Sequence, residues 1–138
     1  MAEFFQIFPV GVIKKKDEEI TIKVYEEYRA ALLGLEQFSH IIVLSWCHEN
    51  DIPEKRRILQ VHPRGDKALP LTGVFGTRSP VRPNLIALST CEILSIDRNV
   101  IRIDKIDAFD GTPVIDIKPC VGKNNSMINV RVPEWVDK

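Results

Sequence analysis

Hydrophobic and polar side chains alternate in several short segments of this chain, with the two-residue period of a half-buried β-strand. Residues 20–25 read Ile-Thr-Ile-Lys-Val-Tyr and predict one such strand. The preceding residues 4–13 are rich in β-branched and aromatic side chains, which favours a strand, and Pro9 places it at a sheet edge or a bulge. The charged residues 14–19 predict a hairpin turn between these two strands.

The most apolar segment of the chain lies at residues 38–47. Its centre, Ile-Ile-Val-Leu at 41–44, predicts a strand that is buried on both faces. The dipeptide Asp110-Gly111 predicts a tight turn further along, since glycine accepts a positive φ. Around that turn and the polar residues 97–99, more strands are predicted at 85–94, 100–106 and 114–117.

Helical signals are few and short. Residues 26–33 contain good helix formers and end at Gly34, a common helix stop. Residues 53–61 predict a short basic helix that begins at a proline and has Asp51 as its candidate cap. Many short strands with two short flanking helices are typical of a mainly β fold, and we expect a closed or partly closed antiparallel β-barrel.

The chain is expected to form one domain over residues 1–138, with the tail 121–138 as a partly extended arm. It is 44% hydrophobic and 28% charged, and no apolar run approaches the about 20 residues that a membrane span needs. No charged-then-apolar leader precedes the first strand, so a cytoplasmic location is expected. Neither the three cysteines nor the three histidines have the spacing of metal ligands, and we predict no metal site.

The segment 73–84 combines a short apolar start with a loop that contains two arginines and two prolines. Pro80 and Pro83 restrict the backbone, so the loop can hold Arg78 and Arg82 in fixed directions at little entropic cost. Arginine is well suited to bidentate capture of a carboxylate or a phosphate. The same pattern is equally compatible with an ordinary rigid turn whose arginines are solvated.

Charge is distributed unevenly although the formal net charge is zero. Residues 54–82 contain seven basic and two acidic side chains, which allows a local phosphate-binding or nucleic-acid-binding face. We predict that this face consists of Arg56, Arg57, Arg64 and Arg82. For residues 55–57 a solvated helix face is an equally good interpretation.

Three blocks in the same order carry a family resemblance. They are Gly-x-Phe-x-x-Arg-Ser-x-x-Arg-Pro-Asn at 73–84, Gly-Leu-Glu-Gln-Phe-Ser-His-Ile-Ile-Val-Leu at 34–44, and Asp-Ala-Phe-Asp-Gly-Thr-Pro within 107–119. Together they resemble the TrmO/YaeB family (TsaA-like, UPF0066), which are S-adenosylmethionine-dependent tRNA N6-adenine methyltransferases with a β-barrel. The resemblance extends from about residue 10 to residue 119.

The resemblance implies a barrel fold, a homodimer, S-adenosyl-L-methionine as methyl donor and tRNA as partner. The implied acceptor is threonylcarbamoyladenosine beside the anticodon. The implied donor contacts are His48, Glu49, Arg78, Leu88, Asp110, Gly111, Thr112 and Pro113. Asn84 joins Arg82 as an expected RNA contact, and no residue is assigned as general base.

Three departures from the family pattern bear on activity. Family members usually have Asn-Pro-Ile-Gly-Leu where this chain has Asn-Leu-Ile-Ala-Leu at 84–88, so Ala87 adds a methyl group. Only residues 14–19 replace a long loop containing Pro-Arg-Gln, and an appended C-terminal domain is not seen. We therefore expect weak donor binding and slow or redirected methylation, with a non-catalytic S-adenosylmethionine- or RNA-binding module as the alternative.

Overall fold

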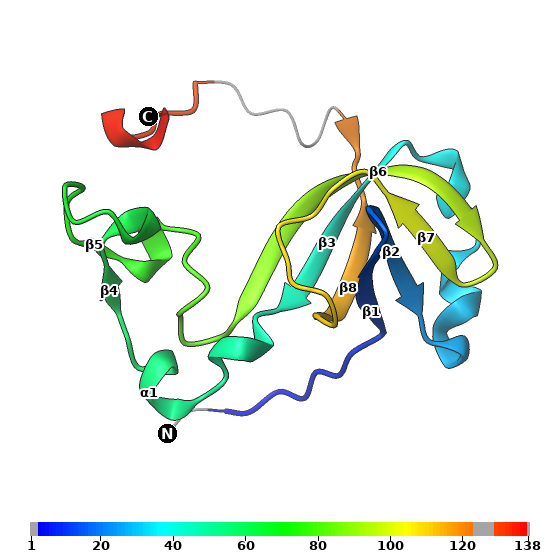
Figure 1. Cartoon of the computed structure of the whole chain (residues 1–138), viewed down its shortest axis with the longest axis horizontal. Coiled ribbons are helices and arrows are strands. Elements are labelled where there is room, and N and C mark those ends of the chain that lie inside the picture. The colour runs from blue at the N-terminus through cyan, green and yellow to red at the C-terminus, as the bar shows by residue number, and fades with distance from the viewer. Residues whose placement is uncertain (1–2, 123–128, 138) are drawn as a thin grey trace.

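Six antiparallel strands close into a barrel (Figure 1), as the sequence predicts. The computed structural model describes residues 3–122 and 129–137. Around the barrel the strands follow one another in the order β1 (Gly11–Lys16), β2 (Glu19–Val24), β7 (Val100–Ile103), β6 (Ile86–Asp97), β3 (His40–Trp46) and β8 (Pro113–Pro119). Within the described residues, closure pairs each barrel strand on both sides, which removes the usual route to edge-to-edge aggregation of the barrel.

Along each strand, residues alternate between the inside and the outside of the barrel, and the inward-facing side chains fill its interior. In β3, Ile41, Val43 and Ser45 are fully buried, whereas the residues between them are only partly covered. The expectation that this strand is buried on both faces is therefore wrong, because the residues of its outer face are only partly buried. The buried cluster consists of Ile13, Ile22, Val24, Ile41, Val43, Cys91, Ile101, Ile103, Ile106 and Val114.

The seam between β1 and β8 is narrow. Only Gly11 with Val114 and Val12 with Pro113 are paired in register. Gly11 also pairs with Val24 on the other side, and a Cβ atom there would lie 2.6 Å from the carbonyl oxygen of Lys23. A residue without a side chain is therefore required where three strands approach closely at the closure.

The β1–β2 hairpin is tighter than the sequence pattern suggests. Its turn consists of Asp17 and Glu18, both with positive φ, as in the hairpin turns whose twist matches that of the strands. Residues 14–16 are consequently part of β1 and not of the turn. The predicted first strand at 4–13 is displaced, because residues 3–9 run outside the barrel without regular structure.

Helical structure in the described residues consists of one 3-10 helix of seven residues and several single turns. The predicted helix at 26–33 is the 3-10 helix η1 (Glu26–Leu32), followed by Gly34 at φ 86°. The predicted helix at 53–61 is only α1 (Pro53–Arg56). Asp51 does not cap it, since Ile52 occupies the cap position. The other single turns are η2 (Leu35–Gln37), η3 (His48–Asn50), η4 (Pro63–Gly65), η5 (Val74–Gly76) and η6 (Glu134–Asp137).

A small lobe stands beside the barrel and contains α1 and the two-stranded sheet of β4 (Gln60–Val61) and β5 (Thr72–Gly73) (Figure 1). Pairing of β4 with β5 ends the predicted helix early. The C-terminal turn η6 reaches this lobe, where a guanidinium N–H of Arg64 donates to the Trp135 carbonyl at 2.9 Å. Part of the predicted tail, residues 123–128 and 138, lies outside the described residues.

In the described part of the chain, no helix has the length and apolar character needed to cross a membrane.

Candidate functional site

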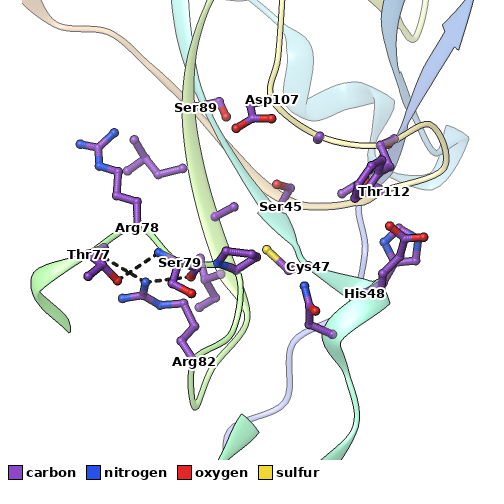
Figure 2. A pocket seen from close by; sticks show the side chains of 18 of the residues that line it. Ser45, Cys47, His48, Thr77, Arg78, Ser79, Arg82, Ser89, Asp107 and Thr112 are labelled. Carbon is purple, nitrogen blue, oxygen red and sulfur yellow. Dashed lines mark hydrogen bonds between the residues drawn. The ribbon is translucent and has the colours of Figure 1, made fainter. Parts of the chain in front are cut away.

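A cavity of about 710 Å³ lies between the rim of the barrel and the loop that returns from the lobe (Figure 2). Its wall on the lobe side is the loop 77–82, and its barrel side combines the ends of β3 and β6 with the turn before β8. The lining side chains are Lys15, Ser45, Cys47, His48, Glu49, Asn50, Thr77, Arg78, Ser79, Pro80, Arg82, Ile86, Ala87, Leu88, Ser89, Asp107, Ala108, Phe109 and Thr112.

The loop 77–82 is held by its own side chains. The Thr77 hydroxyl donates to the Val74 carbonyl at 2.9 Å and accepts the backbone N–H of Ser79 at 3.1 Å. The guanidinium of Arg82 donates to the carbonyls of Thr77 and Ser79, both at 3.2 Å (Figure 2). Arg82 is thus half-buried and closes the loop on itself.

Arg78 has a different environment on the same loop. Its side chain is exposed and lines the cavity. Figure 2 shows it extending away from Arg82. Within residues 3–122 and 129–137 it makes no ion pair or side-chain hydrogen bond with the protein. A rigid loop therefore presents one uncommitted guanidinium to the cavity, which is the arrangement needed to bind an anionic group of a ligand.

A second arginine joins the lobe to the barrel. Arg56 donates to the Pro83 carbonyl at 2.9 Å, to Asp51 at 3.1 Å and to the Asn84 side chain at 3.5 Å. Its guanidinium lies 5.4 Å from the ring centroid of Trp46. The hydrogen bond from the Trp46 indole, assisted by Arg56, lowers the pKa of Asp51. These contacts fix the start of β6 and occupy the Arg56 guanidinium and the Asn84 amide oxygen.

The turn 107–112 is anchored to β1. The backbone N–H of Lys15 donates to the Asp110 carboxylate at 2.8 Å, and the Lys15 ammonium donates to the Ile106 carbonyl at 3.0 Å. Gly111, at φ 86°, donates its N–H to the Ile13 carbonyl at 2.8 Å. The buried Thr112 hydroxyl donates to the Phe109 carbonyl at 2.7 Å. This side of the cavity is consequently as rigid as the loop opposite.

The cavity offers both charges and apolar surface. Glu49 and Asp107 supply carboxylates, and Ser45 and Ser89 supply hydroxyls. Phe109 is 69% exposed although it lines the cavity, which is unusual for a large aromatic side chain on an anchored turn. Such a ring gives a flat surface on which a nucleobase can stack.

The cavity thiol is not a candidate nucleophile. Burial raises the pKa of Cys47, and although Arg82 opposes this shift, the nearby Asp107 carboxylate adds to it. The thiol therefore stays protonated near neutral pH and reacts poorly. Cys91 is a core thiol, and burial raises its pKa to about 11.

The structure brings together part of the predicted site. The side chains that line the cavity include five of the predicted donor contacts, namely His48, Glu49, Arg78, Leu88 and Thr112, and also Arg82, which was predicted to contact RNA. Asp110 and Gly111 do not line the cavity but anchor the turn to β1 through hydrogen bonds. Pro113 pairs with β1 in the seam. Arg57 and Arg64 lie on the lobe outside the cavity.

Several lining residues were not predicted, above all Lys15, Asp107 and Phe109. Asp107 and Phe109 belong to the block 107–119, so that block was a signal from which their place in the site could have been predicted. Lys15 belongs to a charged stretch interpreted as a solvated turn. It enters the cavity only because the tight turn at Asp17 and Glu18 keeps it within β1.

The closed six-stranded barrel with a cavity at its rim places this chain among β-barrel proteins that have a pocket of ligand size. Comparison with known proteins then identifies the family. Residues 6–126 match the sequence profile of the tRNA-methyltransferase O N-terminal domain. The chain therefore belongs to the TrmO family.

Relatives in curated collections span archaea and mammals. A probable S-adenosyl-L-methionine-binding protein of Methanocaldococcus jannaschii is 50% identical over 114 residues, which cover 83% of this chain and 90% of the relative. The human tRNA (adenine(37)-N6)-methyltransferase is 38% identical over 112 residues, covering 80% of this chain and 24% of the human protein.

Solved structures agree with the fold. A crystal structure of TrmO from P. aeruginosa superposes with a TM-score of 0.75 at 25% identity and covers 98% of this chain. The present chain spans 63% of the length of that TrmO chain. The likeness therefore concerns the barrel and its lobe.

We expect Arg56→Ala to destabilise the fold more than the neighbouring exchange Arg57→Ala. Loss of the Arg56 contacts leaves the Pro83 carbonyl without this donor and Asp51 with only the Trp46 indole, at a cost of about 1–2 kcal/mol after allowance for partial exposure. Arg57 is exposed, so its removal should cost less than about 0.5 kcal/mol. Urea unfolding measures both free energies, and equal losses would contradict the bracing role of Arg56.

Proposed function

We propose that this chain is an S-adenosyl-L-methionine-dependent methyltransferase that modifies N6 of an adenosine next to the tRNA anticodon. The observation that carries the proposal is a cavity bounded by two rigid turns, with an uncommitted arginine on one and an exposed phenylalanine on the other. The names of the M. jannaschii and human relatives support the donor and the tRNA acceptor respectively. Threonylcarbamoyladenosine is the acceptor we propose within that class.

The cavity fits the donor in size and in chemistry. A volume of about 710 Å³ lies within the usual range for sites that take nucleotide-sized ligands. Arg78 would hold the carboxylate of the methionine part, while His48 and Glu49 would contact its amino group or the ribose. Thr112 and Leu88 would pack against the nucleoside. When bound, the donor supplies an electrophilic methyl group, and these residues bind and orient it.

We expect the donor side of the cavity to be more open to solvent than in the family pattern. From the β1–β2 hairpin, Lys15 is the residue that lines the cavity, where the family pattern has a long loop. Ala87 also lines it, so its methyl group narrows the rim that glycine usually forms. Open sites admit water and weaken the interactions that hold charge at the reacting atoms. We therefore propose weak donor binding and slow turnover, and the non-catalytic binding module remains the second candidate.

The lobe is the proposed approach surface for tRNA. Arg56 and Arg82 make internal hydrogen bonds, and Arg64 bonds to the tail. We therefore assign the phosphate contacts to exposed cations of the lobe such as Arg57 and Lys67, together with Arg78 in the cavity lining. This is a smaller basic face than the count of charges between 54 and 82 predicts.

A homodimer in the cytoplasm is the proposed working state. Phe4 and Phe5 are 92% and 84% exposed on a segment that runs outside the barrel, and Phe75 on the lobe is 83% exposed. Exposed aromatic residues of this size are typical of surfaces that become buried in an interface. Light scattering that gives the mass of one 15.7 kDa chain at micromolar concentration would rule the dimer out.

Arg78→Ala should weaken donor binding by about 10- to 100-fold, because it removes a charge-assisted hydrogen bond to the donor carboxylate. Isothermal titration with S-adenosyl-L-methionine measures the change. The matched control is Arg29→Ala, a surface arginine on η1 whose partner is Glu26. Equal affinities for wild type and Arg78→Ala would remove Arg78 from the site, and no binding to wild type at millimolar donor would remove the function.

Binding of tRNA should weaken steeply as salt rises, because each neutralised phosphate releases condensed counterions. Arg57→Ala should lower the slope of log affinity against log salt by about one, whereas Arg29→Ala, far from residues 54–82 in the sequence, should not. Fluorescence anisotropy with an anticodon stem-loop gives both slopes. Affinity that does not change with salt, or no binding at low salt, would favour a small-molecule acceptor instead.

A further inference from the structure

Two carboxylates line the cavity, those of Glu49 and Asp107, and Asp107 lies on the turn before β8. Asp107 lines the cavity on the barrel side, and Figure 2 shows it on the turn that faces the loop of Thr77 and Arg82. Its side chain is exposed. Among the described residues it makes no ion pair and accepts no hydrogen bond. An acceptor-only group aimed at a ligand cavity is available for a proton or a donor N–H from the ligand.

The backbone on both sides of Asp107 is fixed. Ile106 is 7% exposed, and its carbonyl accepts the Lys15 ammonium at 3.0 Å. Earlier in the same segment, the Asp104 carboxylate accepts the backbone N–H of Glu92 at 2.8 Å. Later in it, Asp110 accepts the N–H of Lys15. The backbone that carries Asp107 therefore does not have to be ordered when a ligand binds.

Methylation of an exocyclic adenine nitrogen requires a proton acceptor. The nitrogen lone pair is delocalised into the ring, so the nitrogen is a weak nucleophile until its proton begins to leave. As the nitrogen forms its bond to the methyl carbon, the carbon–sulfur bond breaks and its electron pair stays on sulfur. The departing N–H proton must then go to a group within hydrogen-bond reach of the nitrogen.

We propose that Asp107 is this proton acceptor, the general base that the sequence does not identify. The inference rests on the proposed function and adds a residue to it. The N–H proton passes to the carboxylate oxygen, and the exposed side chain then releases it to solvent. Phe109, two residues further on, lines the same cavity and offers the ring face on which the acceptor base can stack with its edge toward Asp107.

Other candidates are less suitable. Asp110 belongs to the turn but does not line the cavity, and its carboxylate accepts the backbone N–H of Lys15. The Cys47 thiol has a raised pKa and stays protonated, so it has no free lone pair of the required basicity. Glu49 stands next to His48 at the end of β3, on the wall proposed to hold the donor. Its replacement should affect donor affinity and not proton transfer.

Methyl transfer from tritiated S-adenosyl-L-methionine to tRNA tests the assignment. Asp107→Asn should lower kcat by about 100-fold or more, the usual loss when a general base is removed, with the donor Kd and the tRNA KM within threefold of wild type. Glu49→Gln should instead raise the donor Kd. Asp104→Asn is the matched control in the same segment, because its amide oxygen can still accept the Glu92 N–H, and its kcat should stay within twofold.

Different outcomes would overturn the role of Asp107 and the proposed function. Wild-type turnover with an unchanged kcat in Asp107→Asn overturns the role of Asp107 and leaves the proposed function standing. A loss that appears only in donor Kd also overturns it. Wild-type protein that neither binds the donor nor transfers methyl groups overturns the function and this inference with it. Thermal unfolding monitors folding of the variants, and Asp107→Ser, which also removes the carboxylate, should reproduce the loss in kcat.

Discussion

The hydrogen bonds that close the barrel between β1 and β8 are the constraint on which the rest of this structure depends. Two residue pairs make the seam, and it is extended by the bonds from Ile13 N–H to the Thr112 carbonyl and from Gly111 N–H to the Ile13 carbonyl. The same bonds fix the turn that forms one wall of the cavity. Barrel closure and site geometry are therefore one property: a change that opens the seam also displaces the turn carrying Asp107 and Phe109.

The opposite wall depends on arginines used as braces. Arg56 ties the lobe to the start of β6, and Arg82 ties the loop 77–82 to itself. Each guanidinium has several donors in a fixed plane, so one side chain can satisfy carbonyls that a lysine would leave unpaired. Arg78 is then the loop arginine left for a ligand. Two of these three arginines make structural contacts and one faces the cavity. A basic segment in a neutral chain is therefore not by itself evidence of a nucleic-acid surface.

Much of the fold could be predicted from the sequence, because the two-residue period of a strand is visible in a few neighbouring residues. The hairpin, the strands that become β2, β3 and β6, and the turn at Asp110-Gly111 are confirmed. The helix predicted at 53–61 is wrong beyond Arg56, since β4 pairs with β5 some ten residues away and local propensity does not report that pairing. The displaced first strand has a similar cause: closure against β8 begins at Gly11.

The site was harder to predict than the fold. His48, Glu49, Arg78, Leu88 and Thr112 line the cavity as the family resemblance implies, although their role there stays a prediction. Lys15 was missed because its approach to Ile106 depends on the register of a hairpin with a turn of two residues. The internal partners of Arg56, such as the Pro83 carbonyl, could not be predicted, because charge and composition do not report contacts between distant residues. That Arg56 and Asn84 also contact RNA stays a prediction.

The central claim is that the cavity between the loop 77–82 and the turn 107–112 binds the methyl donor. A crystal structure of the chain with S-adenosylhomocysteine, the demethylated product, tests this most directly. The account predicts ligand density in that cavity, with the product carboxylate at Arg78 and the turn 107–112 unmoved. Density elsewhere, for example in the apolar groove beside Leu33 and Phe38, or an empty cavity at saturating product, would contradict it.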